Sequence, residues 1–188
     1  MGNIGMSSIQ YTNIEDEKEE VITNTIITSC LDEEELEERL ENKNYCDAVL
    51  MVCLSKESNQ IYVTLTREYN PISGHIWSFP VATTEDNKNI KETISREVKN
   101  KTNLNASLKN IIIQKPTYSN ENITDQRISV AFIESSGVVE ENNKVKLFTL
   151  DEVKELLSSN DEVSNTTRLI LSILCLADGD ISKIVKYL

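Results

Sequence analysis

Apolar residues recur along this chain with two different periods, and these periods predict both strands and helices. Residues 47–54, DAVLMVCL, form a continuous apolar run, as expected for a strand that is covered on both faces. Residues 61–67 alternate between apolar and polar, which predicts a half-buried strand ending at Arg67. Ile90, Ile94 and Val98 are spaced four residues apart, as in an amphipathic helix lying on a core. The pattern therefore predicts an α/β domain.

The same reading places the remaining elements of this domain. Short apolar runs predict strands at residues 111–113, 128–133 and 145–148, and helical spacing predicts helices at residues 151–157, 166–176 and 181–188. Asn89 and Glu92 are spaced to form a capping box at the start of the central helix, and Asn103 suits the left-handed position after its end. His75, the only histidine, is expected in a turn after Gly74. We expect a mixed sheet with one central helix and a cover of C-terminal helices.

The first 44 residues form an acidic extension in this interpretation. The β-branched segment Val21–Ser29 predicts a strand, and a short acidic helix is expected between Asp32 and Asn42. Residues 15–41 hold twelve acidic and two basic residues, so this segment carries most of the net charge of −12. We therefore expect residues 1–44 to be an extension and residues 45–188 to be the main domain.

Composition and charge argue against several classes of function. A net charge of −12 without a basic stripe and interleaved aromatic residues disfavours nucleic-acid binding. The apolar run Leu169–Ala177 is too short to cross a bilayer, and no secretory signal precedes the domain, so we expect a cytoplasmic protein that does not contact a membrane. The four cysteines show no C-x-x-C spacing, so we expect no structural zinc site.

The stretch from Trp77 to Leu104 resembles the Nudix box, Gly-x5-Glu-x7-Arg-Glu-U-x-Glu-Glu-x-Gly-U, in which U is a bulky aliphatic residue. When the box is anchored on residues 96–98, REV, four of its nine defined positions match. Two flanking segments resemble motifs of the ADP-ribose pyrophosphatases: residues 67–71, REYNP, are similar to Arg-Gln-Tyr-Arg-Pro, and residues 79–82, FPVA, are similar to Leu-Pro-Ala-Gly. Both segments lie at the separation from Arg96 that the subfamily shows.

Two downstream segments extend this resemblance. Residues 124–128, TDQRI, are similar to the Ser-Asp-Glu-Arg-Ile of the same subfamily, and residues 148–153, FTLDEV, resemble the strand-to-helix step that closes its domain. The ordered resemblance spans roughly residues 45–177. It implies the Nudix fold, in which a mixed sheet is sandwiched by helices, with an N-terminal strand and helix extension.

The resemblance also implies a chemistry and a set of site residues. Nudix enzymes cleave nucleoside diphosphate derivatives with Mg²⁺ or Mn²⁺, which box carboxylates hold. By resemblance, the residues expected to contact such a ligand are Arg67, Ala82, Lys88, Arg96 and Lys101. Glu97 is the expected metal ligand and catalytic carboxylate, and Glu141 is a second catalytic candidate. A homodimer formed through the N-terminal β element is likewise implied.

The box departs from the family where it should hold metal. Lys88, Asn100 and Lys101 replace three glutamates, which removes three negative charges and adds two positive ones. A unit charge pair at 4 Å is worth about 4 kcal/mol at an effective dielectric near 20, so an ammonium group opposes a divalent ion strongly. Glu97 and Lys101 are spaced to form an ordinary helix-surface ion pair. We therefore expect no cofactor, and binding of a nucleotide diphosphate such as ADP-ribose without efficient hydrolysis.

Two other functions stay open from the sequence. The chain is a divergent hydrolase if Glu97 and Glu141, with Asp125 or Glu85, hold Mg²⁺ or Mn²⁺. It is a protein-interaction module if its cleft is vestigial and its acidic extension or dimer surface is the working part. The sequence names neither the ligand nor the partner.

Overall fold

The computed structural model describes residues 5–15, 18–28, 33–70, 74–84, 89–118, 126–139, 142, 144–159 and 162–185. The chain separates into two compact units. One unit joins Met1–Asp47 to Lys115–Ile128, and the other joins Ala48–Gln114 to Ser129–Leu188. The sequence did not indicate that residues 115–128 associate with the N-terminal part of the chain.

A sheet of eight strands organises the larger unit, with the path β10-β4-β3-β9-β7. Strand β5 pairs with β4, β6 pairs with β3 and β8 pairs with β9. The strands are β3 Ala48–Glu57, β4 Gln60–Asn70, β5 Gly74–Ser78, β6 Val81–Thr83, β7 Asn105–Ile113, β8 Thr117–Tyr118, β9 Arg127–Ser136 and β10 Val145–Thr149. The short strand β8 and the first two residues of β9 belong to the smaller unit.

Strand β3 runs through the centre of the core. Every residue from Ala48 to Ser55 is buried, which confirms the prediction that both faces of this strand are covered. The hairpin to β4 turns at Ser58 and Asn59, whose φ angles are 47° and 71°. Two consecutive residues with positive φ are typical of the tight turns that match the twist of paired strands.

Helix α2, Ile90–Thr102, lies against β3, β4, β6 and β7. Ile94 and Val98 are fully buried, as their spacing predicts, whereas Ile90 in the first turn is only half-buried. The predicted capping box is wrong, because Asn89 has φ −123° and ψ 38° and its side chain accepts no capping hydrogen bond. Asn103 ends the helix in the left-handed conformation, with φ 61°, as predicted.

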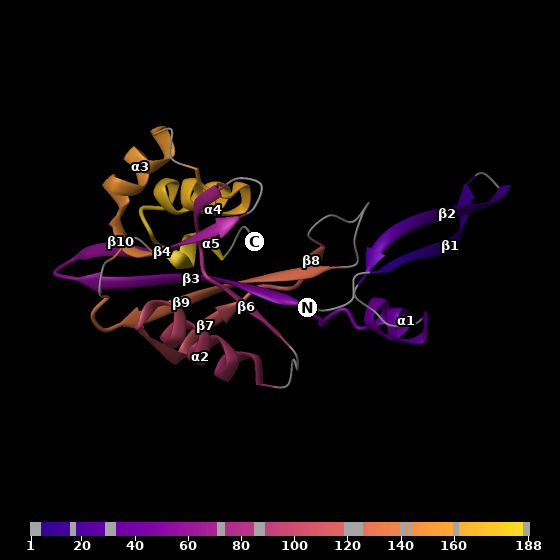
Figure 1. Ribbon diagram of the computed structural model, residues 1–188, viewed down its shortest axis with the longest axis horizontal. Helices are drawn as coiled ribbons and strands as arrows, with labels where there is room; N and C mark the ends of the chain where they lie inside the picture. Colours follow the sequence, from indigo (N-terminus) through magenta and orange to yellow (C-terminus); the bar gives the residue numbers. More distant parts are fainter. Residues whose placement is uncertain are drawn as a thin grey trace. The chain divides into compact units, whose positions relative to one another are not determined.

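Three helices cover the sheet on the side away from α2 (Figure 1). They are α3 Leu150–Ser158, α4 Asn165–Leu176 and α5 Ile181–Ile184. Thr149 and Glu152 form a complete capping box at α3, which was not predicted. Asp180 accepts a hydrogen bond from the Ser182 amide and so caps the start of α5, as predicted. The predicted α/β class, with a mixed sheet packed between helices and C-terminal helices in the cover, is therefore confirmed.

The smaller unit contains a hairpin and a short helix. Strands β1, Gly5–Glu15, and β2, Lys18–Thr28, pair antiparallel, and helix α1 spans Glu33–Glu41. The strand and acidic helix expected here are thus present, whereas β1 was not predicted because its polar composition lacks a strong strand pattern. The expected cap residue Asp32 lies outside the described residues. None of the helices in the described stretches has both the length and the apolar character that crossing a membrane requires.

Charged and aromatic side chains hold this unit together. Asp47 accepts a hydrogen bond from an Arg39 guanidinium nitrogen at 2.6 Å and another from the Arg127 backbone N–H at 2.8 Å. The Arg127 guanidinium donates to the Tyr118 hydroxyl at 2.7 Å and lies over that ring. The Arg39 guanidinium likewise donates to the Tyr45 hydroxyl and lies over the Tyr45 ring. Because Arg39 and Arg127 are far apart in sequence, this network joins residues 115–128 to the N-terminal segment.

We expect Ile94→Ala to lower the free energy of unfolding by about 2–5 kcal/mol, because it leaves a cavity between α2 and the sheet. Denaturant unfolding of the purified variant measures this change. Lys91→Ala, at an exposed position of the same helix, is the matched control and should shift stability by no more than about 0.5 kcal/mol. A loss below 1 kcal/mol for Ile94→Ala would show that α2 does not pack on the sheet.

Candidate anion-binding site

The register between β4 and β5 brings two cross-strand pairs together. Arg67 lies opposite Trp77, and Tyr69 lies opposite His75. Side chains that are paired across antiparallel strands point to the same face, and positions two apart on a strand share that face. The Arg67 guanidinium accordingly lies over the Trp77 ring, 5.6 Å from its centre. The Tyr69 and His75 rings meet edge to face at 5.4 Å.

Trp77 is held firmly by the segment that leads into α4. Its backbone N–H donates to the Glu162 carbonyl at 2.8 Å, and its carbonyl accepts from the Ser164 amide at 3.1 Å. Its ring packs edge to face against Phe148 of β10, with the ring centres 5.3 Å apart. Arg67 therefore rests on an aromatic surface whose position is set by three elements of the fold.

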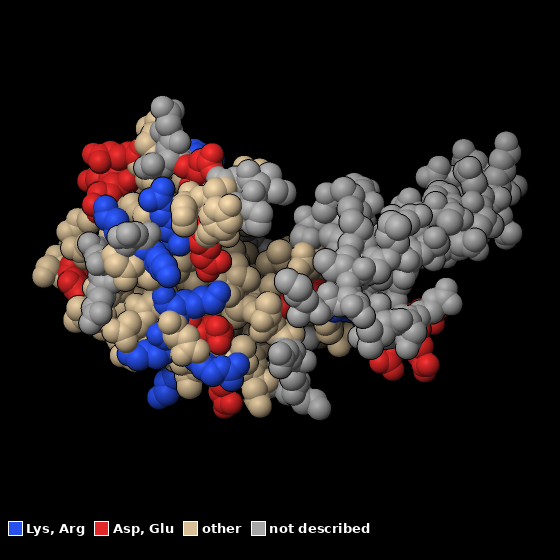
Figure 2. Space-filling model, in the orientation of Figure 1, with Lys and Arg blue, Asp and Glu red and all other residues tan. Residues whose placement is uncertain are grey.

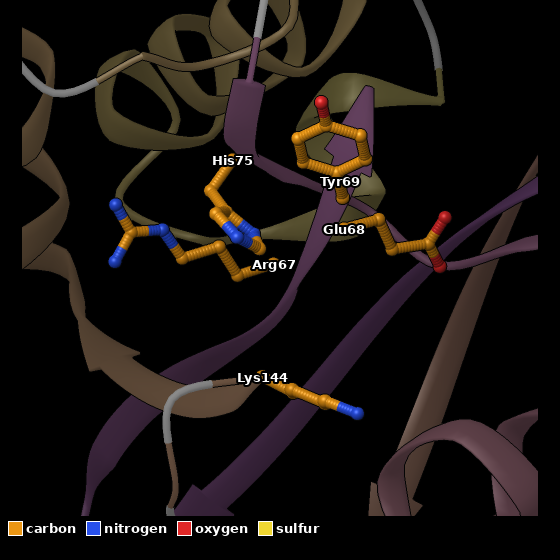
Figure 3. A pocket seen from close by; sticks show the side chains of 5 residues that line it. All are labelled: Arg67, Glu68, Tyr69, His75 and Lys144. Carbon is orange, nitrogen blue, oxygen red and sulfur yellow. The ribbon is translucent and has the colours of Figure 1, made fainter. Parts of the chain in front are cut away.

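Lys144 is placed beside Arg67 by the start of β10. The Asn142 side-chain oxygen accepts hydrogen bonds from the amides of Lys144 and Val145, at 2.7 and 3.1 Å. The Lys144 carbonyl in turn accepts from the Arg67 backbone N–H at 2.7 Å. This arrangement extends the β10–β4 pairing by one residue, so that Lys144 and Arg67 are paired through their backbones, while their side chains extend in opposite directions (Figure 3).

These residues enclose a cavity of about 610 Å³, which is lined by Arg67, Glu68, Tyr69, His75 and Lys144 (Figure 3). Ligand pockets of proteins are commonly of this size. Figure 3 shows Arg67 and Glu68 extending from β4 in opposite directions, as the alternation of a strand requires. The Arg67 Nε is buried and has no hydrogen-bond partner among the described residues.

Glu68, the one carboxylate among the described residues that line the cavity, forms an ion pair with Lys101 of α2 at 3.6 Å. The predicted ion pair between Glu97 and Lys101 is therefore wrong. Glu97 lies instead 3.6 Å from the Arg96 guanidinium and accepts from the Asn100 amide at 3.5 Å. The Lys101 ammonium group lies near β4, and there it pairs with Glu68 rather than with Glu97.

Arg96 and Ala82 do not lie at this cavity. The Arg96 side chain is 65% exposed and borders a separate surface depression of about 490 Å³, together with Lys99 of α2 and Leu108 of β7. Ala82 is fully buried in β6 opposite Val49, so its side chain belongs to the core. The structure thus places Arg67, but neither Arg96 nor Ala82, at this cavity.

Several sequence candidates lie outside the described part of the chain. They are Glu85, Lys88, Asp125 and Glu141. Conversely, Tyr69, His75 and Lys144 line the cavity but were not predicted as site residues, and His75 lies in β5 rather than in the expected turn. The signal that could have found them is the short connection between Arg67 and Trp77, since a hairpin there pairs these residues directly.

The described residues offer little metal or nucleophile chemistry. Among them, no group of three His, Cys, Asp or Glu side chains is placed to hold a metal ion. Burial raises the pKa of the Cys53 thiol to about 12, so a thiolate is not accessible there near neutral pH. Burial also raises the pKa of Cys175. The chemistry that the arrangement supports is the binding of an anion.

Lys and Arg side chains are frequent on one face of the larger unit. Figure 2 shows them across the visible face, from the region of α3 to that of α2, with Asp and Glu side chains between them. The larger unit therefore presents many cations although the chain has a net charge of −12.

Comparison with known proteins identifies no family for this chain. No protein-family model matches the sequence, and no curated protein matches it. The resemblance to Nudix proteins therefore rests on the short motifs and on the order of the elements that follow them.

Proposed function

We propose that this chain is a Nudix-fold protein that binds a nucleoside diphosphate derivative, such as ADP-ribose, without efficient metal-dependent hydrolysis. The observation that carries the proposal is the cavity beside β4 and β5, which Arg67, His75 and Lys144 line. The order of strands and helices and the position of α2 after β6 agree with the motifs that resemble the ADP-ribose pyrophosphatases.

The charge of the cavity favours a ligand with phosphate groups. Among the described residues that line the cavity, Arg67 and Lys144 are cationic, and the one carboxylate, Glu68, is offset by Lys101. A guanidinium group presents several N–H donors in a plane and binds phosphate oxygens through paired hydrogen bonds.

The helix that resembles the Nudix box supports binding rather than hydrolysis. At its three carboxylate positions it carries Glu97, Asn100 and Lys101. Glu97 is close to the Arg96 guanidinium, and Lys101 brings an ammonium group to the same segment. A pair of divalent ions needs several oxygen ligands of negative charge, which this helix does not offer. The hydrolase alternative needs Glu141, with Asp125 or Glu85, to join Glu97 in holding metal, and these three partners of Glu97 lie outside the described residues.

We expect ADP-ribose to raise the melting temperature of the protein in the presence of EDTA, by about 3–6 °C at ten times the dissociation constant. Arg67→Gln should remove most of this rise, because it deletes the guanidinium group that faces the phosphates. Lys144→Gln, at an exposed position, should weaken binding without altering the fold. Thermal shift and calorimetric titration, each referred to the ligand-free variant, measure these effects.

Arg96→Gln is the matched control for these variants. It removes the same type of charge from an exposed position that does not line the cavity, so the ligand-induced rise should be unchanged. A rise that is lost in Arg96→Gln and retained in Arg67→Gln would place the ligand on α2 and contradict the proposed site.

We also expect no appreciable cleavage of ADP-ribose in the presence of Mg²⁺ or Mn²⁺, because at the box positions α2 supplies one carboxylate, Glu97, where the family uses several. Chromatographic measurement of AMP over time tests this expectation, and Glu97→Gln serves as the comparison. Metal-dependent turnover at about 1 per second or faster that Glu97→Gln abolishes would refute the non-hydrolytic assignment.

A further inference from the structure

Tyr69 presents an unusually exposed aromatic ring at the cavity that Arg67 and Lys144 line. The residue is 67% exposed, although it sits in β4 directly beside the anion-binding side chains. A single exposed aromatic residue needs no explanation by itself. Here, however, the ring borders a cavity of about 610 Å³ and lies on the same face of the strand as Arg67.

The contact with His75 keeps the Tyr69 ring in a defined orientation. The two residues are register partners across β4 and β5, and their rings meet at 64° with centres 5.4 Å apart. An edge-to-face contact occupies at most one face of either ring. The high exposure of Tyr69 shows that the described structure leaves much of this ring uncovered. Figure 3 shows the ring standing at the wall of the cavity next to His75.

The spacing between Tyr69 and Arg67 suits a nucleotide. Residues two apart on a strand are separated by roughly 7 Å, which leaves room for a sugar between a phosphate group on Arg67 and a planar base on Tyr69. Aromatic side chains beside cations are a recurring means of holding a base and its phosphate together, because every base has a π-face that can stack.

We propose that Tyr69 is the base-recognising residue of this site, so that the nucleotide's heterocycle stacks on its ring while the phosphates contact Arg67. This inference rests on the proposed nucleotide binding. It assigns each side chain to the part of the nucleotide that it contacts. Sugar phosphates and inorganic pyrophosphate, which have no base, then bind only at the cationic part of the cavity. Their affinity should not depend on Tyr69.

The test compares two probes, ADP-ribose and inorganic pyrophosphate, by calorimetric titration in EDTA against the full chain and two variants. Tyr69→Leu keeps an apolar side chain but removes the aromatic ring, and Tyr69→Phe keeps the ring. We expect Tyr69→Leu to weaken ADP-ribose binding by about tenfold, which is within the range measured for base–aromatic stacking. Its pyrophosphate affinity should stay within about twofold of the parent, and Tyr69→Phe should resemble the parent for both probes.

Each remaining outcome has a distinct meaning. Unchanged ADP-ribose binding by Tyr69→Leu, or equal weakening of both probes, would overturn the role of Tyr69 in base recognition. A parent protein that binds neither probe would overturn the proposed function itself. Because Tyr69 is exposed, the Tyr69→Leu variant should fold normally, and an unchanged melting temperature without ligand checks this.

Discussion

The antiparallel pairing of β4 with β5 is the constraint on which the candidate site depends. It sets Arg67 opposite Trp77 and Tyr69 opposite His75, so that a cation and an exposed aromatic ring share one face. The same alternation points Glu68 away from Arg67 and toward Lys101 of α2, although Glu68 also borders the cavity. A register shift of one residue would exchange these faces and bring the carboxylate over the tryptophan. The Trp77 backbone donates a hydrogen bond to the Glu162 carbonyl and accepts one from the Ser164 N–H, and both help to prevent such a shift.

The distribution of charge determines which class of ligand this geometry favours. Most of the negative charge of the chain is carried by residues 15–41, so the rest of the chain is nearly neutral. Among the described residues that line the cavity, Arg67 and Lys144 are cationic, and the one carboxylate, Glu68, already has a cationic partner. The described lining therefore favours an anionic ligand.

The sequence predicted the parts of the fold that follow from strong periodic patterns. The apolar run of β3 and the four-residue spacing of Ile94 and Val98 each required burial, and both were found buried. Strand β5, GHIWS, has only five residues and was missed, since so short a run carries little periodic signal. Because β5 was missed, the pairing of Arg67 with Trp77 was missed as well. That pairing depends on the register of the two strands rather than on residue type.

The candidate site was harder to predict than the fold for a related reason. Motif spacing grouped Arg67 with Arg96 and Lys101, but spacing along the chain does not say to which face of a strand or helix each side chain points. Arg96 is exposed beside β7, and Lys101 reaches Glu68 rather than Glu97. These are choices between competing charged partners of similar strength, and surface ion pairs of this kind differ by less than about 1 kcal/mol.

The most direct test of this account is an NMR titration of the protein with ADP-ribose in EDTA, observing the indole N–H of Trp77, the only tryptophan, and the Nε–H of Arg67. The two groups are in contact in the structure, with the guanidinium 5.6 Å from the ring centre. The account predicts that both signals shift together and saturate, while the Arg96 Nε–H does not move. Saturable shifts confined to Arg96 and other residues of α2, and seen only when Mg²⁺ or Mn²⁺ is added, would contradict it.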